Sequence, residues 1–167
     1  MGLFKRTTLP DTVEQGLDLL PGERVLAFGT DPLGRYVIAT THGLHLQRQP
    51  PAYRRLDWID IRHASFEQTK LTLEVTEGGS SSTLRVPLLE AGQLPEVVRE
   101  RVTASFALQQ HVPLRGSLGV TVTARRQPGS SDLAWGMAYD RGLDRADPKL
   151  AADAEQALAG VRSESGL

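Results

Sequence analysis

The sequence predicts a mostly β, α+β fold: a curled antiparallel sheet or barrel capped by an amphipathic helix, with a C-terminal β-hairpin and a short helix. Two observations lead to this prediction. Short runs of alternating apolar and polar residues, separated by turn residues, recur over residues 25–88, and a period of two is typical of half-buried strands. Residues 94–108 instead repeat apolar positions every three to four residues, which indicates a helix with one apolar face.

The first half of the chain reads as a meander of six or seven strands. A short helical turn is expected over 12–20 and ends at Pro21-Gly22, and strands follow over 25–29, 36–41, 44–47, 54–61, 70–76 and 83–88. Alternation in the third of these places His45 on the solvent-facing side, opposite Leu44 and Leu46. The apolar phase changes near Trp58, which predicts a bulge or bend there.

The helix expected over 94–108 is the clearest periodic signal in the chain. Leu94, Val98, Val102 and Phe106 recur every four residues and form one stripe. Pro113 is expected to stop the helix from continuing, because proline cannot supply the backbone N–H that a helix interior needs. The apolar stripe must therefore pack on the strands that precede it.

A smaller β pattern follows the helix. Strands are predicted over 118–126 and 133–140, around the turn at 128–132, and Asp147-Pro148 has the residue types that begin a helix. A two-stranded hairpin is barely stable alone in water. We therefore expect this hairpin either to extend the main sheet or to pair across a subunit interface.

The second hairpin strand has one face of large residues and one of small residues. Leu133, Trp135, Met137 and Tyr139 share the large face, which we expect to pack inward. The small face would let a neighbouring element approach closely, and basic residues stand nearby. The candidate interaction surface therefore comprises Ala134, Gly136, Ala138, Arg125 and Arg126.

Composition excludes several kinds of chemistry. The 167 residues carry a net charge of −1, so no global field favours nucleic acid, and we expect no nucleic-acid partner. The absence of cysteine excludes disulfides, thiolate catalysis and cysteine-ligated zinc, and it fits a cytoplasmic protein. The first ten residues do not resemble a secretory signal. Residues 3–6 are expected to be a frayed basic terminus, with an amphipathic surface anchor as the alternative.

No catalytic or metal site emerges from the motifs. Ser117 lies between two glycines but lacks the pattern of a nucleophile elbow, and the chain has no phosphate-binding glycine loop. Asp57, Asp60 and His63 are spaced by three, so they would converge on a helical turn and diverge on a strand. We expect a solvated edge beside a buried Trp58 there, with a metal site as the alternative. No cofactor is expected.

Three sequence segments resemble bacterial pleckstrin-homology-like (PH-like) and GRAM-type domains. They are PGERVLAF at 21–28, VIATTHGLHL at 37–46 and RRLDWIDIRHASFE at 54–67, and the chain is also similar to actinobacterial proteins of this length. The resemblance covers about residues 20–110 and implies a PH-like domain over 1–110. Residues 111–160 depart from the simple family pattern, and we expect them to form a hairpin and helix extension packed on that domain, followed by a disordered tail over 161–167. Phosphoinositide-binding members carry several basic residues between their first two strands. Here that loop has only Arg35, so membrane association is expected to be peripheral at most.

The fold alone does not select a function, because PH-like domains host lipid-binding, peptide-binding and structural members. The leading hypothesis is a non-catalytic module that binds an unknown protein partner or a second copy of itself. The alternative is a small-molecule or lipid binder with a cavity between barrel and helix, lined by Trp58, Phe66 and Phe106. An enzyme is not expected.

Overall fold

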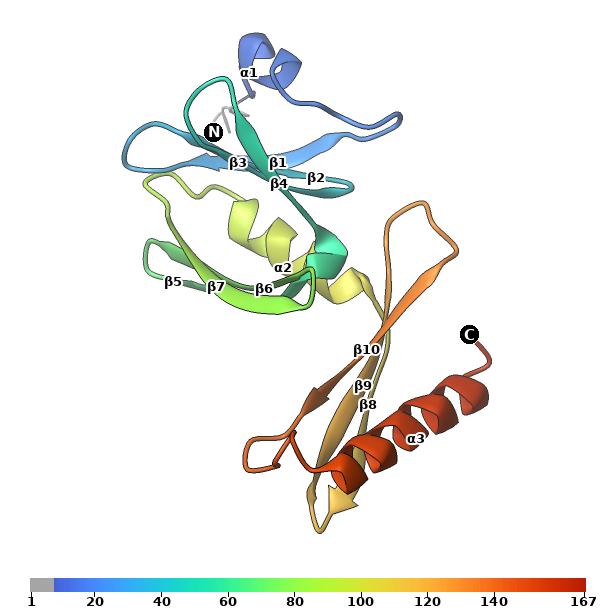
Figure 1. Cartoon of the computed structure of the whole chain (residues 1–167). Coiled ribbons are helices and arrows are strands. Elements are labelled where there is room, and N and C mark those ends of the chain that lie inside the picture. Colours follow the sequence, from blue (N-terminus) through green and yellow to red (C-terminus); the bar gives the residue numbers. More distant parts are fainter. Residues whose placement is uncertain (1–7) are drawn as a thin grey trace, which may run out of the picture. The chain divides into compact units, whose positions relative to one another are not determined.

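Residues 8–167 are described by a computed structural model, in which strands predominate (Figure 1). The chain divides into two compact units, Met1–Thr103 and Ala104–Leu167. The boundary lies seven residues before the one expected at 110. The expectations for residues 3–6 fall outside the described residues. No described helix is long and apolar enough to cross a bilayer.

In residues 8–103, the described part of the first unit, seven antiparallel strands form two sheets. The first sheet has the order β1-β2-β3-β4 and comprises β1 (Val25–Thr30), β2 (Tyr36–Thr40), β3 (Gly43–Gln47) and β4 (Tyr53–Asp57). The second has the order β5-β6-β7 and comprises β5 (Ile61–Glu67), β6 (Lys70–Glu77) and β7 (Ser80–Pro87). The meander order is therefore confirmed. The expected single curled sheet or barrel is not, because the described strands of this unit pair within two separate sheets.

The bend predicted near Trp58 is confirmed, and it separates the two sheets. A 3₁₀ turn, η1 (Trp58–Asp60), lies between β4 and β5. The Trp58 side chain is fully buried, and its indole N–H donates to the Thr40 carbonyl oxygen at 3.1 Å. The change of apolar phase arises because the chain leaves one sheet and enters the next.

The prediction that His45 faces solvent is wrong. His45 lies opposite Ile38 in the ladder between β2 and β3, and its side chain is buried. The face that holds Ile38 is covered by the N-terminal segment, whose Leu9 and Leu17 pack into the same apolar cluster. That segment includes α1 (Asp11–Gln15), a shorter helix than the turn expected over 12–20.

The amphipathic helix is α2 (Leu94–Ala104), which ends four residues before the predicted position. Leu94, Val98 and Val102 are buried as expected. Phe106 instead begins β8 (Phe106–Arg115). The helical stripe and a strand alternation overlap at Phe106, and the strand prevails because β8 has a pairing partner in β9. Pro113 is compatible with β8 because this strand lies at the edge of its sheet.

The second unit is a three-stranded sheet with a helix on one face (Figure 1). Its strands are β8, β9 (Leu118–Arg126) and β10 (Leu133–Tyr139), in the order β10-β9-β8, and its helix is α3 (Pro148–Glu164). The hairpin was expected to extend the main sheet or to need a subunit partner, but β8 supplies its third strand.

The core of the second unit lies between its sheet and α3. Val120 and Val122 of β9 are buried with Ala154 and Val161 of α3. The carboxylate of Asp147 accepts from the backbone N–H of Lys149 at 2.9 Å, which confirms the predicted start of the helix. The disordered tail expected from residue 161 is wrong in its first part, because burial of Val161 holds α3 in place through Glu164.

Candidate functional site

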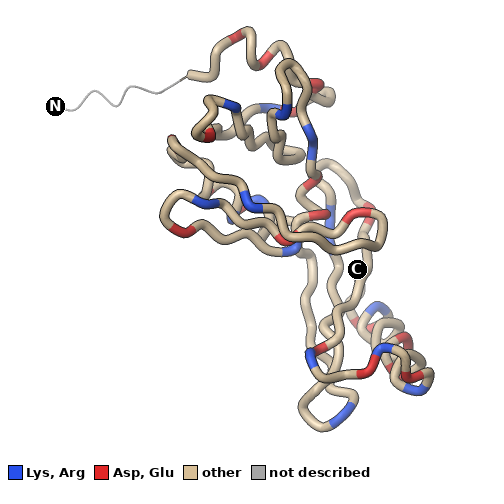
Figure 2. The backbone as a smooth tube through the Cα atoms, turned by 60° about the vertical axis from the view of Figure 1, so that its left-hand side comes forward, with Lys and Arg blue, Asp and Glu red and all other residues tan. Residues whose placement is uncertain are grey.

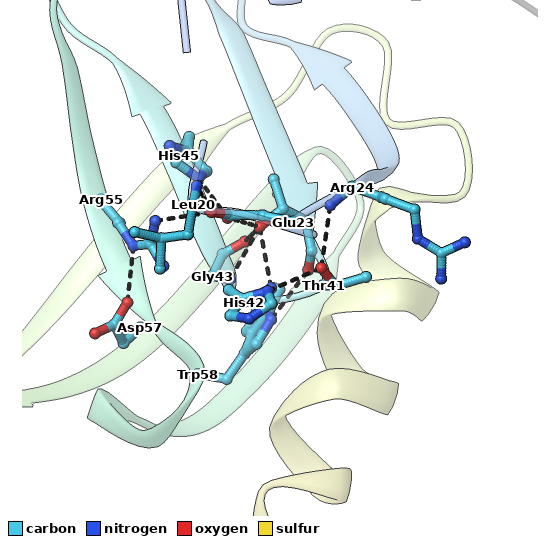
Figure 3. Close-up of polar contacts among 11 residues, drawn as sticks. Leu20, Glu23, Arg24, Thr41, His42, Gly43, His45, Arg55, Asp57 and Trp58 are labelled. Atoms are coloured by element: carbon cyan, nitrogen blue, oxygen red, sulfur yellow. Dashed lines mark hydrogen bonds and ion pairs between the residues drawn. The ribbon is translucent and has the colours of Figure 1, made fainter. Parts of the chain in front are cut away.

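The most connected polar cluster in the described residues surrounds the carboxylate of Glu23, in the segment that leads into β1 (Figure 3). One carboxylate oxygen accepts from the Thr40 hydroxyl and from Nε2 of His45, the latter at 3.2 Å. The other accepts from the Leu20 backbone N–H at 2.8 Å and from Nη1 of Arg55 at 3.0 Å. Since the Glu23 side chain is 0% exposed, these four donors replace the water that a carboxylate requires.

The turn between β2 and β3 builds one side of this cluster. The Thr40 hydroxyl oxygen accepts from the backbone N–H groups of His42 at 3.2 Å and Gly43 at 3.0 Å. Gly43 is needed for space, because a Cβ there would lie 2.6 Å from the Leu56 carbonyl oxygen. Gly43 does not adopt a positive φ, so space and not backbone freedom requires a glycine here.

Strand β4 builds the other side of the cluster. Arg55 donates from Nε to the Asp57 carboxylate at 2.8 Å, so its guanidinium joins two carboxylates. Burial would raise the pKa of Glu23, but the bonds from Thr40, Leu20 and His45 and the charge of Arg55 outweigh it and lower the pKa to about 2. Burial lowers the pKa of His45, which favours the neutral ring.

This geometry predicts that the first unit loses stability in acid. An unfolded Glu23 has a pKa near 4.5 and the folded one about 2, so the stabilisation is fully present above pH 4.5 and is lost as the pH falls toward 2. The shift corresponds to roughly 3 kcal/mol. Chemical denaturation of Glu23→Gln across this range should show a shallower pH dependence than wild type. Equal slopes for the two proteins would contradict the assignment.

The cluster contains the residue types of acid–base catalysis but not their arrangement. The Thr40 hydroxyl donates to Glu23 and not to His45. With a pKa of about 2, the Glu23 carboxylate is too weak a base to activate this hydroxyl as a nucleophile. The side chains of His45 and Glu23 are only 3% and 0% exposed, which leaves a substrate no approach to either. The arrangement is suited to fixing the segment before β1 against β2, β3 and β4.

Sequence reasoning did not find this cluster, although the signals lay in the three segments quoted for the PH-like resemblance. Glu23 comes from PGERVLAF, Thr40 and His45 from VIATTHGLHL, and Arg55 from RRLDWIDIRHASFE. A glutamate directly before a buried strand, with a histidine and an arginine in nearby strands, was the available clue.

The sequence-based candidates for chemistry are not brought together. Asp57 is paired with Arg55, and the described residues contain no group of three or more His, Asp or Glu able to hold a metal ion. Ser117 is exposed in the tight turn between β8 and β9. Phe106, expected to line a cavity under the helix, lies in β8 with the Arg125 guanidinium 4.1 Å from its ring centroid.

The small-residue face of β10 is formed as predicted. Trp135, Met137 and Tyr139 pack against the core beneath α3, which confirms that the large face packs inward. Ala134, Gly136 and Ala138 therefore lie on the opposite face of the sheet, and Ala134 is exposed.

The two arginines of the candidate interaction surface do not share that exposed position. Arg125 is opposite Ala134 but is only 6% exposed, and its guanidinium donates to the Ser105 hydroxyl. Arg126 is exposed and lies opposite Leu133, so its side chain belongs to the face that carries α3. The predicted surface is thus reduced to the three small residues of β10.

The outer edge of β10 carries regularly spaced backbone groups. The Asp140 N–H donates to the Gly119 carbonyl at 3.0 Å, so even-numbered residues of β10 bond to β9. The odd-numbered residues, which are Leu133, Trp135, Met137 and Tyr139, direct their N–H and C=O groups away from β9. Among the described residues, β10 pairs with β9 alone.

Comparison with protein-family models and with curated proteins finds no match for this chain.

Proposed function

We propose that the protein is a non-catalytic, cytoplasmic interaction module, with a PH-like first unit, that binds a protein partner. The partner adds an extended strand to the outer edge of β10. The observation that carries the proposal is the row of outward N–H and C=O groups on a strand with neither charge nor proline. Such an edge is a template for strand addition.

The other sheet edges carry the features that discourage strand addition. Pro113 lies in β8 and Pro87 ends β7, while β4 carries Arg54 and Arg55, and β5 carries Arg62 and Glu67. The outer edge of β1 is bridged at Thr30 by Glu90. Prolines, charges and covering segments protect edge strands from pairing. β10 has none of these, which supports it as the docking strand.

Two features support a PH-like first unit. Its strands form two consecutive antiparallel meanders followed by the amphipathic α2, and the three segments that resemble PH-like domains meet at the Glu23 cluster.

The surface charges bear on the kind of partner. In the β1–β2 loop, Nε of Arg35 lies 2.6 Å from the Asp31 carboxylate, and acidic and basic residues are interspersed in each unit (Figure 2). These charges favour a protein over an anionic lipid surface as partner.

Selection of peptides tests this proposal with a defined probe. A phage-displayed library of random 12-residue peptides, selected on the full chain, should yield sequences with alternating apolar residues that bind wild type. Met137→Pro removes one outward N–H and should lower peptide affinity about tenfold or more, because the ladder loses a central bond.

Met137→Ala is the matched control, since it shortens the same side chain and keeps the N–H. Peptides should bind it nearly as well as wild type. Both variants should retain a cooperative melting transition, because the Met137 N–H does not bond to β9. Equal binding to the proline and alanine variants, or a selection that yields no strand-like peptides, would overturn the proposal.

A further inference from the structure

We infer that the strand added to β10 is β10 of a second copy of this chain, paired antiparallel about Gly136. This inference rests on the proposed function, because it names the partner of the same edge. The result would be a continuous six-stranded sheet, with the two β10 strands at its centre.

The first argument is the size pattern of the strand, Leu-Ala-Trp-Gly-Met-Ala-Tyr. Read in either direction from Gly136, it is large, small, large. Antiparallel pairing about Gly136 therefore places Trp135 opposite Met137 of the second copy, and Ala134 opposite Ala138 of the second copy. Large residues meet large residues on one face, and small residues meet small residues on the other.

The second argument is the phase of the backbone bonds. Pairing about Gly136 sets odd-numbered residues opposite odd-numbered residues, and these are the residues whose N–H and C=O point outward. Trp135 and Met137 of the second copy would exchange both bonds. Gly136 would face its own copy in a non-hydrogen-bonded pair, where Cα atoms approach to about 4.5 Å, and glycine and alanine fit this close approach.

The third argument is the continuity of the apolar face. The Trp135 and Met137 side chains already pack on the core beneath α3, and the neighbouring copy would extend that face by the same residues. A methionine sulfur beside an aromatic ring is a favourable contact.

Acidic residues set the length of the ladder. Asp132 would lie opposite Asp140 of the second copy at each end, and like charges in opposing positions are unfavourable. The Asp140 carboxylate is also already bound within its own sheet, where it accepts from the Gly119 N–H and lies 2.8 Å from Nε2 of His111. The pairing therefore covers Leu133–Tyr139 and ends before these acids.

A charge exchange on the full chain tests the register. The double variants Ala134→Lys/Ala138→Lys and Ala134→Glu/Ala138→Glu each place like charges opposite one another across the pair. Sedimentation equilibrium should show a wild-type dimer, and each variant alone should have a dimer dissociation constant raised about tenfold or more. An equimolar mixture of the two variants should recover dimers, since lysine then faces glutamate.

Thr121→Lys/Thr123→Lys is the matched control, because it adds the same two charges to the same face of the sheet, on β9 and away from the edge, and it should dimerise as wild type does. The inference is overturned if the charged variants dimerise like wild type, or if the mixture stays monomeric while wild type dimerises. It is also overturned if wild type is monomeric at roughly 1 mM, because a dimer that has not formed at that concentration is too weak to be a specific association. If wild type is monomeric but peptide binding is still weakened by Met137→Pro, the proposed function stands without the dimer. If neither dimerisation nor peptide binding at β10 is found, both the dimer and the proposed function are overturned.

Discussion

Replacing Val98 with aspartate is expected to abolish the cooperative unfolding transition of the first unit. Val98 is 0% exposed in the middle of α2, between the buried Leu94 and Val102. An aspartate there would place a carboxylate among apolar side chains, and the loss should exceed about 4 kcal/mol. That is a large part of the stability of a domain of this size.

Trp58 reports on this transition, because its ring is fully buried in the first unit. In a Trp135→Phe background, Trp58 is the only tryptophan. Its emission should be shifted to the red in Val98→Asp before any denaturant is added. Thr103→Asp is the matched control on an exposed position of the same helix, and it should melt close to the parent protein. A sigmoidal Trp58 transition retained in Val98→Asp would show that α2 does not close this core.

Replacing Glu23 with alanine should destabilise the first unit by about 3–5 kcal/mol, the usual cost of removing one partner of a buried charged pair. The Thr40 hydroxyl, the His45 ring and the Arg55 guanidinium would each lose their shared acceptor. Unsatisfied buried groups cost more than the lost bonds themselves contribute.

Two comparisons separate this effect from general surface change. Glu23→Gln keeps the shape and one acceptor oxygen, and it should fall between wild type and the alanine variant. Glu67→Ala removes an exposed glutamate and should change the free energy of unfolding by no more than about 0.5 kcal/mol. Denaturation with urea, followed by Trp58 emission, measures all three. A Glu23→Ala protein as stable as Glu67→Ala would remove the structural role assigned to the cluster.

The parts of the fold that depend on neighbours in the chain could be predicted from the sequence. Alternation located the strands of the first unit, and the phase change at Trp58 located the turn between its sheets. The continuation of the helix to residue 108 was wrong, because Phe106 satisfies both a period of four and a period of two. Only the pairing of β8 with β9, a contact between separate segments, decides between them.

The Glu23 cluster could not be predicted for a related reason. Glutamate is seldom buried, and its burial here follows from the segment before β1 covering the outer face of the first sheet. The same covering segment makes His45 a buried donor where alternation predicts a solvent-facing ring. The small face of β10 was predictable because it needs only the period of a strand, whereas the open edge required knowing which strand lies beside it.

Amide hydrogen exchange resolved by residue along β10 tests the central claim most directly, because it reports which N–H groups are bonded. In dilute, monomeric protein, the amides of Ala134, Gly136 and Ala138 should exchange slowly, since they bond to β9. The amides of Trp135, Met137 and Tyr139 should exchange fast and become protected when a strand binds. Slow exchange at every position of β10 in the monomer would show that the edge is already covered and would contradict strand addition at this edge.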